Sequence, residues 1–432
     1  MNKSYLIKNG NILTGEDNVY LKNTDVLIED GIITYIGNNI DNNRQNSVVV
    51  IDATDMLVAP AFYNLHVHLG ETIFRGKCDG MDLWEYLDVS HDTYNDATWK
   101  KWEPEIHRLS GYITILENMK HGVGYIVCNR GWDEIKASRI EASCLYPIVN
   151  ISKLKKYYDN ILSLSRIKKE YEPNIGTSIF LQSMYLCDDE KMGMIKQIMD
   201  EDDSIQLFVH IAETVREREY IWEKYHCTPI EALHRFGLLL DRTFCVHSIY
   251  LTSNDRKLIK KADAKVVLCP ISNMKLRDGY PDIESLMNDN INITVATDGL
   301  ATNNSASILE ELKMLALSSG GKISAKRLLD MVTVNPAKYM NQNRNVGIIR
   351  EKYKTNISIF SAKKYNLCDY NTTVSNMIYN YCDFRCESII SNGDLVYHKG
   401  VSTFIDQGDI VEQYCELFEK LEFGITLAVK NA

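Results

Sequence analysis

Apolar and polar residues alternate over short segments near both ends of the chain, and each segment stops at a turn residue. Period-two alternation bounded by Asn-Gly, Asp-Gly or a lone glycine is typical of antiparallel strands joined as hairpins. The segments are residues 5–7, 25–28, 33–36, 356–360, 388–391 and 395–397. Because the same pattern occurs at both ends, it predicts one small β-domain assembled from both.

The middle of the chain follows another pattern, in which short apolar runs alternate with helix-length stretches such as 99–120 and 188–201. Continuous apolar runs are expected for parallel strands that are buried on both faces. The runs are residues 58–69, 124–128, 144–149, 175–181, 205–211, 243–246, 265–269 and 291–296. Eight such runs predict an α/β fold, a (β/α)8 barrel of the TIM type.

These patterns divide the chain into four parts. We expect residues 1–57 and 350–405 to form a β-sandwich domain and residues 58–349 to form the catalytic barrel. Apolar residues from Val411 to Leu421 follow helical spacing, so residues 406–432 are predicted to contain a docked C-terminal helix.

Composition narrows the classes of partner. The 432 residues carry 48 Lys and Arg against 58 Asp and Glu, a net charge of −10, with no basic block. Nucleic acid is therefore not an expected partner, and no apolar run approaches the roughly 20 residues of a membrane span. The eleven cysteines include no C-x-x-C pair, and the N-terminus has no apolar signal-peptide core. We expect reduced thiols and a cytoplasmic location, and both a monomer and a homo-oligomer stay open.

Candidate chemistry gathers where the apolar runs end. His66 and His68 are two residues apart, so in a strand their side chains point to the same side. His210, His247 and Asp298 each end another run. Taken singly, each has an ordinary alternative: an H-x-H by chance, a hydrogen-bonded core histidine, or an Asp-Gly turn. Together they lie at the carboxyl ends of predicted strands, where barrel enzymes place their sites, and they suit a mononuclear metal.

The motifs, and their order along the chain, resemble those of the amidohydrolase superfamily, in particular its aminopurine and nucleoside deaminases and triazine hydrolases. The likeness covers nearly the whole chain and is greatest to 5-methylthioadenosine/S-adenosylhomocysteine deaminases. It rests on Val58–Asn64, His66-Val67-His68, Phe74-Arg75-Gly76, Glu85-Tyr86-Leu87, His210 with Glu213, His247, Cys269–Leu276, Thr297-Asp298-Gly299, Asn303-Asn304-Ser305 and Met331-Val332-Thr333.

The resemblance implies one divalent metal per chain, zinc in the first place, with iron and manganese as alternatives. Its implied ligands are His66, His68, His210 and Asp298. The implied catalytic residues are Glu213, His247 and Asp298, with Glu213 as the proton shuttle. Gln182, Glu213 and His247 are implied to contact the substrate, a small amino-heterocycle that loses ammonia.

Two departures from the family bear on the substrate. Gln182-Ser183-Met184-Tyr185 stands where relatives commonly have His-Ser-Pro-Tyr, and the segment 144–155 lacks the arginines that would hold a homocysteine carboxylate. We therefore expect a 5-methylthioadenosine-like substrate in preference to S-adenosylhomocysteine. The residue that would hold ribose is open among Asp92, Asn95 and Asp96.

Other functions stay open at this point. A triazine-type or guanine-type amino- or chlorohydrolase would use the same fold, and a non-catalytic scaffold would need none of the metal and acid–base positions. A two-metal cyclic-amide hydrolase needs a bridging lysine where this chain has Gln182. Zinc deaminases with H-x-E and P-C-x-x-C motifs are excluded, because neither motif occurs.

Overall fold

One of the two sheets is an eight-stranded parallel barrel. The computed structural model describes residues 4–38, 40, 48–148, 161, 175–340 and 345–421. Strands pair in chain order from β6 to β13, and every pair is parallel. They are β6 (Phe62–Val67), β7 (Val123–Asn129), β8 (Glu141–Ile148), β9 (Ile175–Leu181), β10 (Gln206–Ile211), β11 (Thr243–His247), β12 (Lys265–Leu268) and β13 (Asn292–Val295). The predicted (β/α)8 barrel is confirmed.

Side-chain and main-chain hydrogen bonds bring the first and last barrel strands together. The Asn64 side chain accepts from Thr297 N at 3.1 Å and donates to Thr297 Oγ1 at 2.7 Å. One residue further along, Asp298 N donates to His66 O at 3.1 Å. This contact brings Asp298, three residues after the end of β13, beside His66 on β6.

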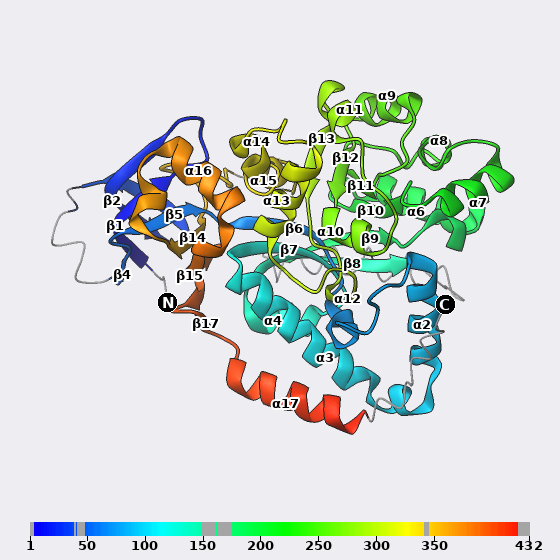
Figure 1. Ribbon diagram of the computed structural model, residues 1–432, viewed down its shortest axis with the longest axis horizontal. Coiled ribbons are helices and arrows are strands. Elements are labelled where there is room, and N and C mark those ends of the chain that lie inside the picture. The colour runs from blue at the N-terminus through cyan, green and yellow to red at the C-terminus, as the bar shows by residue number, and fades with distance from the viewer. Residues whose placement is uncertain are drawn as a thin grey trace.

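Helices surround the barrel and connect its strands (Figure 1). Those between residues 69 and 340 are η1 (Leu69–Phe74), α2 (Leu83–Asn95), α3 (Ala97–Lys120), α4 (Trp132–Ser138), η2 (Met184–Leu186), α6 (Asp189–Glu201), α7 (Val215–Tyr225), α8 (Pro229–Arg235), α9 (Ser253–Lys261), α10 (Pro270–Lys275), α11 (Ile283–Asn288), α12 (Leu300–Asn303), α13 (Ile308–Ser318), α14 (Ala325–Asp330) and α15 (Val334–Met340). Several start at a capping box, such as Thr228 with Glu231 in α8, which satisfies free N–H groups of the first turn.

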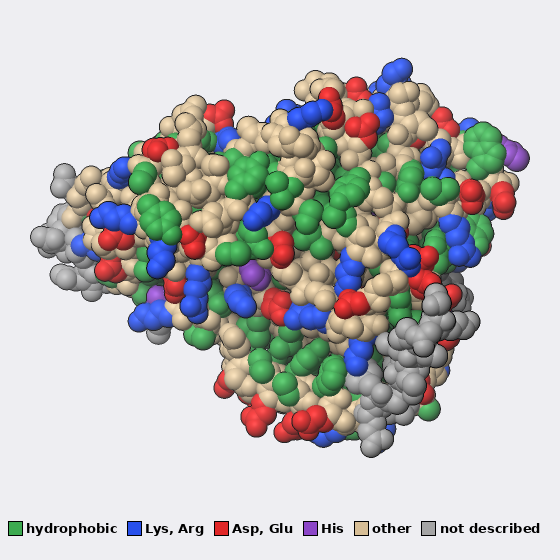
Figure 2. Space-filling model, in the orientation of Figure 1, with side chains coloured by type: hydrophobic (Ala, Val, Ile, Leu, Met, Phe, Trp, Pro, Cys, Tyr) green, Lys and Arg blue, Asp and Glu red, His purple; other side chains and the backbone are tan. Residues whose placement is uncertain are grey.

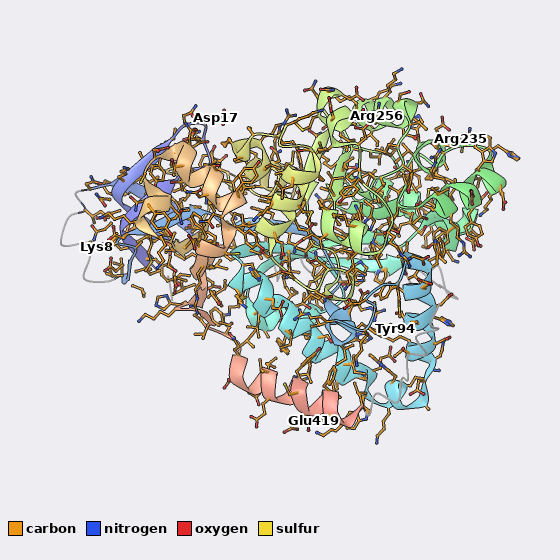
Figure 3. All side chains as sticks on the ribbon, viewed as in Figure 1. Lys8, Asp17, Tyr94, Arg235, Arg256 and Glu419 are labelled. Atoms are coloured by element: carbon orange, nitrogen blue, oxygen red, sulfur yellow. The ribbon has the colours of Figure 1, made fainter. Side chains whose placement is uncertain are left out.

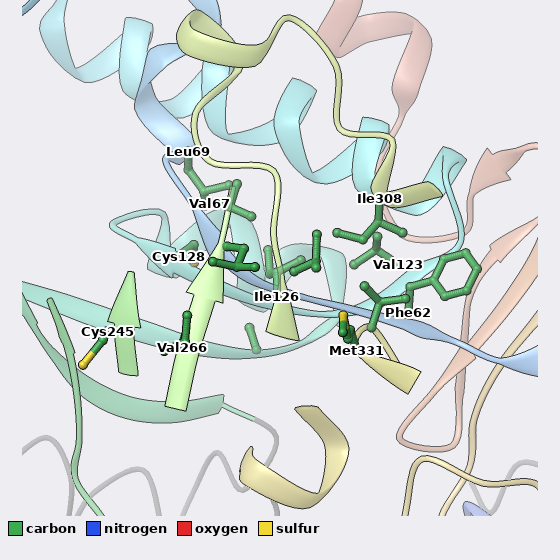
Figure 4. Close-up of a cluster of buried hydrophobic side chains, with 14 of the residues drawn as sticks. Phe62, Val67, Leu69, Val123, Ile126, Cys128, Cys245, Val266, Ile308 and Met331 are labelled. Atoms are coloured by element: carbon green, nitrogen blue, oxygen red, sulfur yellow. The ribbon is translucent and has the colours of Figure 1, made fainter. Parts of the chain in front are cut away.

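Two apolar layers pack against opposite sides of the barrel sheet. Outward side chains such as Val67, Ile126 and Val266 meet the helices, as Figure 4 shows. Aromatic side chains fill the inside, and Phe208 and Phe244 stack there with ring centroids 4.3 Å apart. The inside of the barrel is therefore packed with apolar side chains, which leaves its carboxyl end for a polar site.

The second sheet is built from both ends of the chain, as predicted. Its nine strands are β1 (Ser4–Leu13), β2 (Tyr20–Glu29), β3 (Ile32–Gly37), β4 (Val49–Asp52), β5 (Met56–Pro60), β14 (Asn356–Ser361), β15 (Arg385–Ser391), β16 (Asp394–His398) and β17 (Val401–Ser402). Antiparallel pairing of β5 with β14 joins the two ends. Lys8 and Asp17 lie in this domain, far from Arg235 and Arg256 of the barrel (Figure 3).

One predicted strand is divided in the structure. The apolar run 58–69 contains β5 of the mixed sheet and β6 of the barrel, which meet at Ala61. Both strands are buried, so hydrophobicity alone gives no signal at the junction. Here Ala61 N still bonds to Asn356 of the mixed sheet, whereas Phe62 N bonds to Gly122 beside the barrel.

The remaining helices cover the edges of the fold. They are η3 (Lys364–Leu367), α16 (Tyr370–Tyr379), η4 (Tyr381–Asp383) and α17 (Gln407–Lys420). The last of these lies along α3, where Arg108 Nη2 donates to Gln413 Oε1 at 2.7 Å (Figure 1). Of the predicted C-terminal segment, residues 422–432 lie outside the described residues.

Surface and thiol chemistry show no unusual feature. All eleven cysteines are free thiols, and side chains of both charges are interspersed over the face shown in Figure 2. Within the described part of the chain, no helix combines the length and apolar character that crossing a membrane requires.

Candidate active site

Three histidines and one aspartate meet at the carboxyl end of the barrel. His66 Nε2 lies 3.0 Å from the Nε2 atoms of both His68 and His210. Asp298 Oδ1 lies 3.2 Å from His66 Nε2 and 3.3 Å from His68 Nε2. All four ligand atoms fall within 4.8 Å of one another, so this group could hold a metal ion.

A bulge in β6 turns both early histidines toward the barrel axis. Tyr63 and Leu65 belong to the cluster inside the barrel, whereas Val67 belongs to the outer layer. The register of β6 against β7 shifts between Asn64 and Val67. An extra residue in a strand changes the side to which the next side chains point. His66 therefore faces the axis although simple alternation from Leu65 would turn it outward.

The chemistry of the donor set fits a borderline divalent metal such as zinc. Three imidazole nitrogens and a carboxylate oxygen point at one buried position, and only a shared cation gives all their lone pairs a partner. Tetrahedral zinc with bonds of about 2.0–2.1 Å separates its ligand atoms by roughly 3.3 Å. The observed separations of 3.0–3.3 Å are close to that value.

Burial and neighbouring charges set the charge states of the four residues. Burial lowers the pKa of His66 to about 4 and that of His210 well below its usual value. Both are thus neutral, which is the form that can bind a metal. Burial opposes charge on His68, but the Glu71 carboxylate outweighs it and raises the pKa to about 9. Asp298 is also buried, yet His66 and His68 hold its pKa well below the usual range.

Next to this group lies an acid–base pair. His247 Nε2 is 3.3 Å from Glu213 Oε1, and His247 Nδ1 is 2.9 Å from Asn273 Oδ1. Burial, and after it the Glu217 carboxylate, raise the pKa of Glu213 well above its usual value. Ligand atoms of His210, Glu213 and His247 also lie within 4.8 Å of one another. The pair therefore adjoins the metal group, and a carboxyl with a raised pKa is suited to act as a general acid.

The backbone is strained where these residues leave their strands. His247 has a φ of 70° and Asp298 a φ of 62°, in the left-handed region that side chains with a Cβ rarely adopt. Ala212, just before Glu213, has a φ of 52°. Such positions cost about 1–3 kcal/mol each and persist where surrounding structure fixes them, often at functional sites.

Supporting contacts that the sequence did not reveal hold the ligands in place. His68 Nδ1 bonds to Glu71 Oε1 at 2.8 Å, and Tyr86 OH donates to Glu71 Oε2 at 3.0 Å. Ser272 Oγ and Thr302 Oγ1 donate to Asp298 Oδ2 at 2.6 and 3.1 Å. The only sequence signal for Glu71 was its position three residues after His68, which is meaningful only once η1 is known to be helical.

Other predicted residues have different surroundings. Gln182 is half-buried and directly follows β9, which pairs with the strand that carries His210. The three residues considered for holding ribose have other surroundings. Asp96 accepts a hydrogen bond from Trp99 N, Asn95 Nδ2 donates to His91 O, and the Asp92 side chain is 90% exposed. Most of the Arg-poor segment, residues 149–155, lies outside the described residues.

The comparisons with known proteins agree with this fold. The amidohydrolase family model matches residues 57–396, so the chain belongs to the amidohydrolase family. It is 26% identical over 433 residues to a 5-methylthioadenosine/S-adenosylhomocysteine deaminase of Pyrococcus furiosus, covering 96% of this chain and 100% of the relative. A 5'-deoxyadenosine deaminase of Methanosarcina acetivorans is 27% identical over 436 residues, covering 96% and 98%.

A solved structure gives the same result for the fold. The crystal structure of an adenosine deaminase from Xanthomonas campestris with bound zinc superposes with a TM-score of 0.85 at 19% identity, covering 97% of this chain and 98% of that chain. The family makes this chain a hydrolase, and both relatives that it resembles are deaminases by name.

Proposed function

We propose that the chain deaminates an adenosine-type nucleoside without a charged 5' substituent, and that it uses one zinc ion. The observation that carries this proposal is the contact between two groups: the converging His66, His68, His210 and Asp298, and the Glu213–His247 pair. A metal site alone would suit many hydrolases. The adjoining carboxyl, whose pKa is raised, is what attack on an aromatic amidine needs, because the ring nitrogen must take up a proton.

In the proposed reaction, Asp298 and Glu213 carry out separate proton transfers. Zinc bound by the four residues would supply hydroxide near neutral pH, since it lowers the pKa of bound water from 15.7 to about 7. Asp298 accepts a proton from the attacking water, and Glu213 protonates the ring nitrogen. His247, held by Asn273, hydrogen-bonds to the oxygen that adds to the ring carbon. Asp298 then passes its proton to the amino group, which leaves as ammonia, and Glu213 takes back the remaining proton of the added oxygen as the ring carbonyl forms.

An aromatic group beside Glu213 supports an uncharged substituent on the substrate. Trp84 on α2 and Tyr185 on η2 have ring centroids 5.5 Å apart, and Tyr185 lies 5.9 Å from Tyr220 on α7. Burial and the Glu213 charge raise the pKa of Tyr185, which places this group next to the acid–base pair. Aromatic faces favour a heterocycle or a thioether over a carboxylate. The guanidinium carbon of Arg216 lies 4.1 Å from the centroid of the Trp84 ring, so one positive charge adjoins these aromatic side chains.

Ammonia release across a set of substrates tests the proposal. The set is adenosine, 5'-deoxyadenosine, 5-methylthioadenosine, S-adenosylhomocysteine, guanine and melamine, each assayed with zinc-loaded enzyme. We expect 5'-deoxyadenosine or 5-methylthioadenosine to have the highest kcat/KM. The highest value for S-adenosylhomocysteine would show that Arg216 or another cation holds its carboxylate. The highest value for melamine or guanine would favour the triazine-type or guanine-type function.

A further inference from the structure

One buried carboxylate beside the site has no function in the reaction described above. Asp278, on the loop between α10 and α11, is 5% exposed. Its Oδ2 has no hydrogen-bond partner among the residues that the structure describes. Buried acceptors are nearly always hydrogen-bonded, so an unpartnered carboxylate oxygen indicates either a ligand or an unusual constraint.

The main chain fixes this carboxylate in place. Asp278 N donates to Asn273 O at 2.8 Å, and Asp278 O accepts from Tyr250 OH at 2.7 Å. Positive φ angles on both sides, 60° at Arg277 and 119° at Gly279, produce a sharp turn. Arg277 extends to Glu85 Oε2 at 2.9 Å and is exposed, whereas Asp278 is buried. The turn thus separates a surface cation from a buried carboxyl group.

The buried side of this turn adjoins the acid–base pair. The charges that act on the Asp278 carboxylate are, in order, those of Glu213, His247 and Asp298. A chain of contacts connects it to the same groups, because Asn273 bonds both to Asp278 N and to His247 Nδ1. Burial, with the Glu213 charge next, raises the pKa of Asp278 to about 8. Among the charges that act on it from the described residues, that of His247 favours the ionised form and those of Glu213 and Asp298 oppose it, so a hydrogen-bond donor from the substrate would stabilise the carboxylate and lower its pKa.

We propose that Asp278 is a specificity-determining residue, which accepts a hydrogen bond from an O–H or N–H donor of the substrate other than the amino group that leaves. The inference rests on the proposed deaminase function and adds a requirement to it. An adenine ring has no such donor on its edge, so in a nucleoside the donor would be a sugar hydroxyl. In a diamino-heterocycle it would be a second amino group.

Two matched substrate pairs distinguish these sources. Adenosine and 2',3'-dideoxyadenosine differ in the sugar hydroxyls, and 2-aminoadenosine and adenosine differ in one ring amino group. We expect zinc-loaded wild-type enzyme to prefer the donor-bearing member of one pair by about 10- to 100-fold in kcat/KM, the range for a hydrogen bond to a charged group. Asp278→Asn should reduce that preference, and Asp278→Leu, which keeps the branching at Cγ but has no polar side-chain atom, should abolish it.

A surface variant serves as the control. Asp289→Asn removes a half-exposed carboxylate that pairs with Arg256, and it should keep the wild-type preference. The unpartnered Nδ2 of Asn273 suggests a competing role, in which Asp278 only supports Asn273 and thereby His247. In that case the Asp278 variants would lower kcat/KM equally for both members of each pair. That result, or a wild-type enzyme without preference in either pair, would overturn the proposal.

The test does not depend on turnover. Binding of the matched product pairs, inosine with 2',3'-dideoxyinosine and 2-aminoinosine with inosine, can be measured by calorimetry on the same zinc-loaded proteins. Absence of ammonia from every wild-type reaction would contradict the proposed function. An equal Kd for both members of each product pair, in wild type and in Asp278→Leu, would instead contradict the role of Asp278.

Discussion

The metal-facing and substrate-facing halves of the site differ in how many of their polar side-chain atoms have a hydrogen-bond partner within the described chain. Around the metal group, Asp298 receives hydrogen bonds from Ser272 and Thr302, and His68 is paired with Glu71; His66 Nδ1 is the exception. On the substrate side, Asp278 Oδ2 has no partner within the described chain. A fully bonded group is already organised for its ligand, whereas an incompletely bonded one needs the ligand to complete it.

This difference predicts that changes in the two halves have separable effects. The largest effect is expected for His210→Ala, which removes one of the four converging ligand atoms. Metal content should fall well below one ion per chain, and ammonia release should fall by more than the 10–100-fold typical of losing a residue that only supports a ligand. Elemental analysis and turnover of the same sample check this. His234→Ala, an exposed histidine on α8, should match wild type in both.

Glu213→Gln should affect the substrate half alone. The amide keeps the shape of the side chain but cannot exchange the proton, so turnover should fall by about 10²–10⁴-fold. Metal content should stay at the wild-type level, because Glu213 is outside the four-residue metal group. Glu219→Gln on the exposed side of α7 is the matched control. If Glu213→Gln retained most of the activity, Glu213 would have no part in the mechanism.

Glu71→Gln tests whether the contacts around the metal group act as supports. Losing the carboxylate that orients His68 should weaken metal affinity by about 10–100-fold, with the fold intact. Competition with a chromogenic chelator gives the affinity, and the melting curve reports the fold. Glu284→Gln changes an exposed carboxylate paired with Lys322 and should leave affinity unchanged. An unchanged affinity in Glu71→Gln would mean that the His68–Glu71 contact does not support the metal.

The smallest effect is expected for Gln182→Ala. We assign Gln182 one neutral hydrogen bond to the heterocycle, and such a bond contributes about 0.5–1.5 kcal/mol. KM should therefore rise by about 2- to 13-fold, with kcat and metal content close to wild type. Steady-state kinetics on the best substrate measure this. A large loss of kcat with unchanged KM would move Gln182 from binding to catalysis.

The same contrast explains what could be predicted from the sequence. His66, His68, His210 and Asp298 follow apolar runs, and strand ends of a barrel meet at one rim, so their convergence could be expected. The bulge between Asn64 and Val67 could not, because it depends on pairing with β7. Glu71 and Asp278 lie on a short helix and a loop, without a periodic pattern. Their positions next to the site depend on how those segments fold.

Fold prediction had a similar limit. Hydrophobic runs identified the barrel strands because both faces of each strand are buried. For that same reason the run 58–69 gave no sign that it supplies strands to two sheets. Pairing of β5 with β14 connects residues about 300 positions apart, and local pattern carries no information about such contacts.

Metal titration tests the central claim most directly. Chelator-stripped protein would receive zinc in steps, and ammonia release from the best substrate would be followed at each step. The account predicts that activity rises linearly from background and reaches its plateau at about one zinc per chain. Full activity in the stripped protein, or a plateau at two zinc ions per chain, would contradict a single metal held by His66, His68, His210 and Asp298.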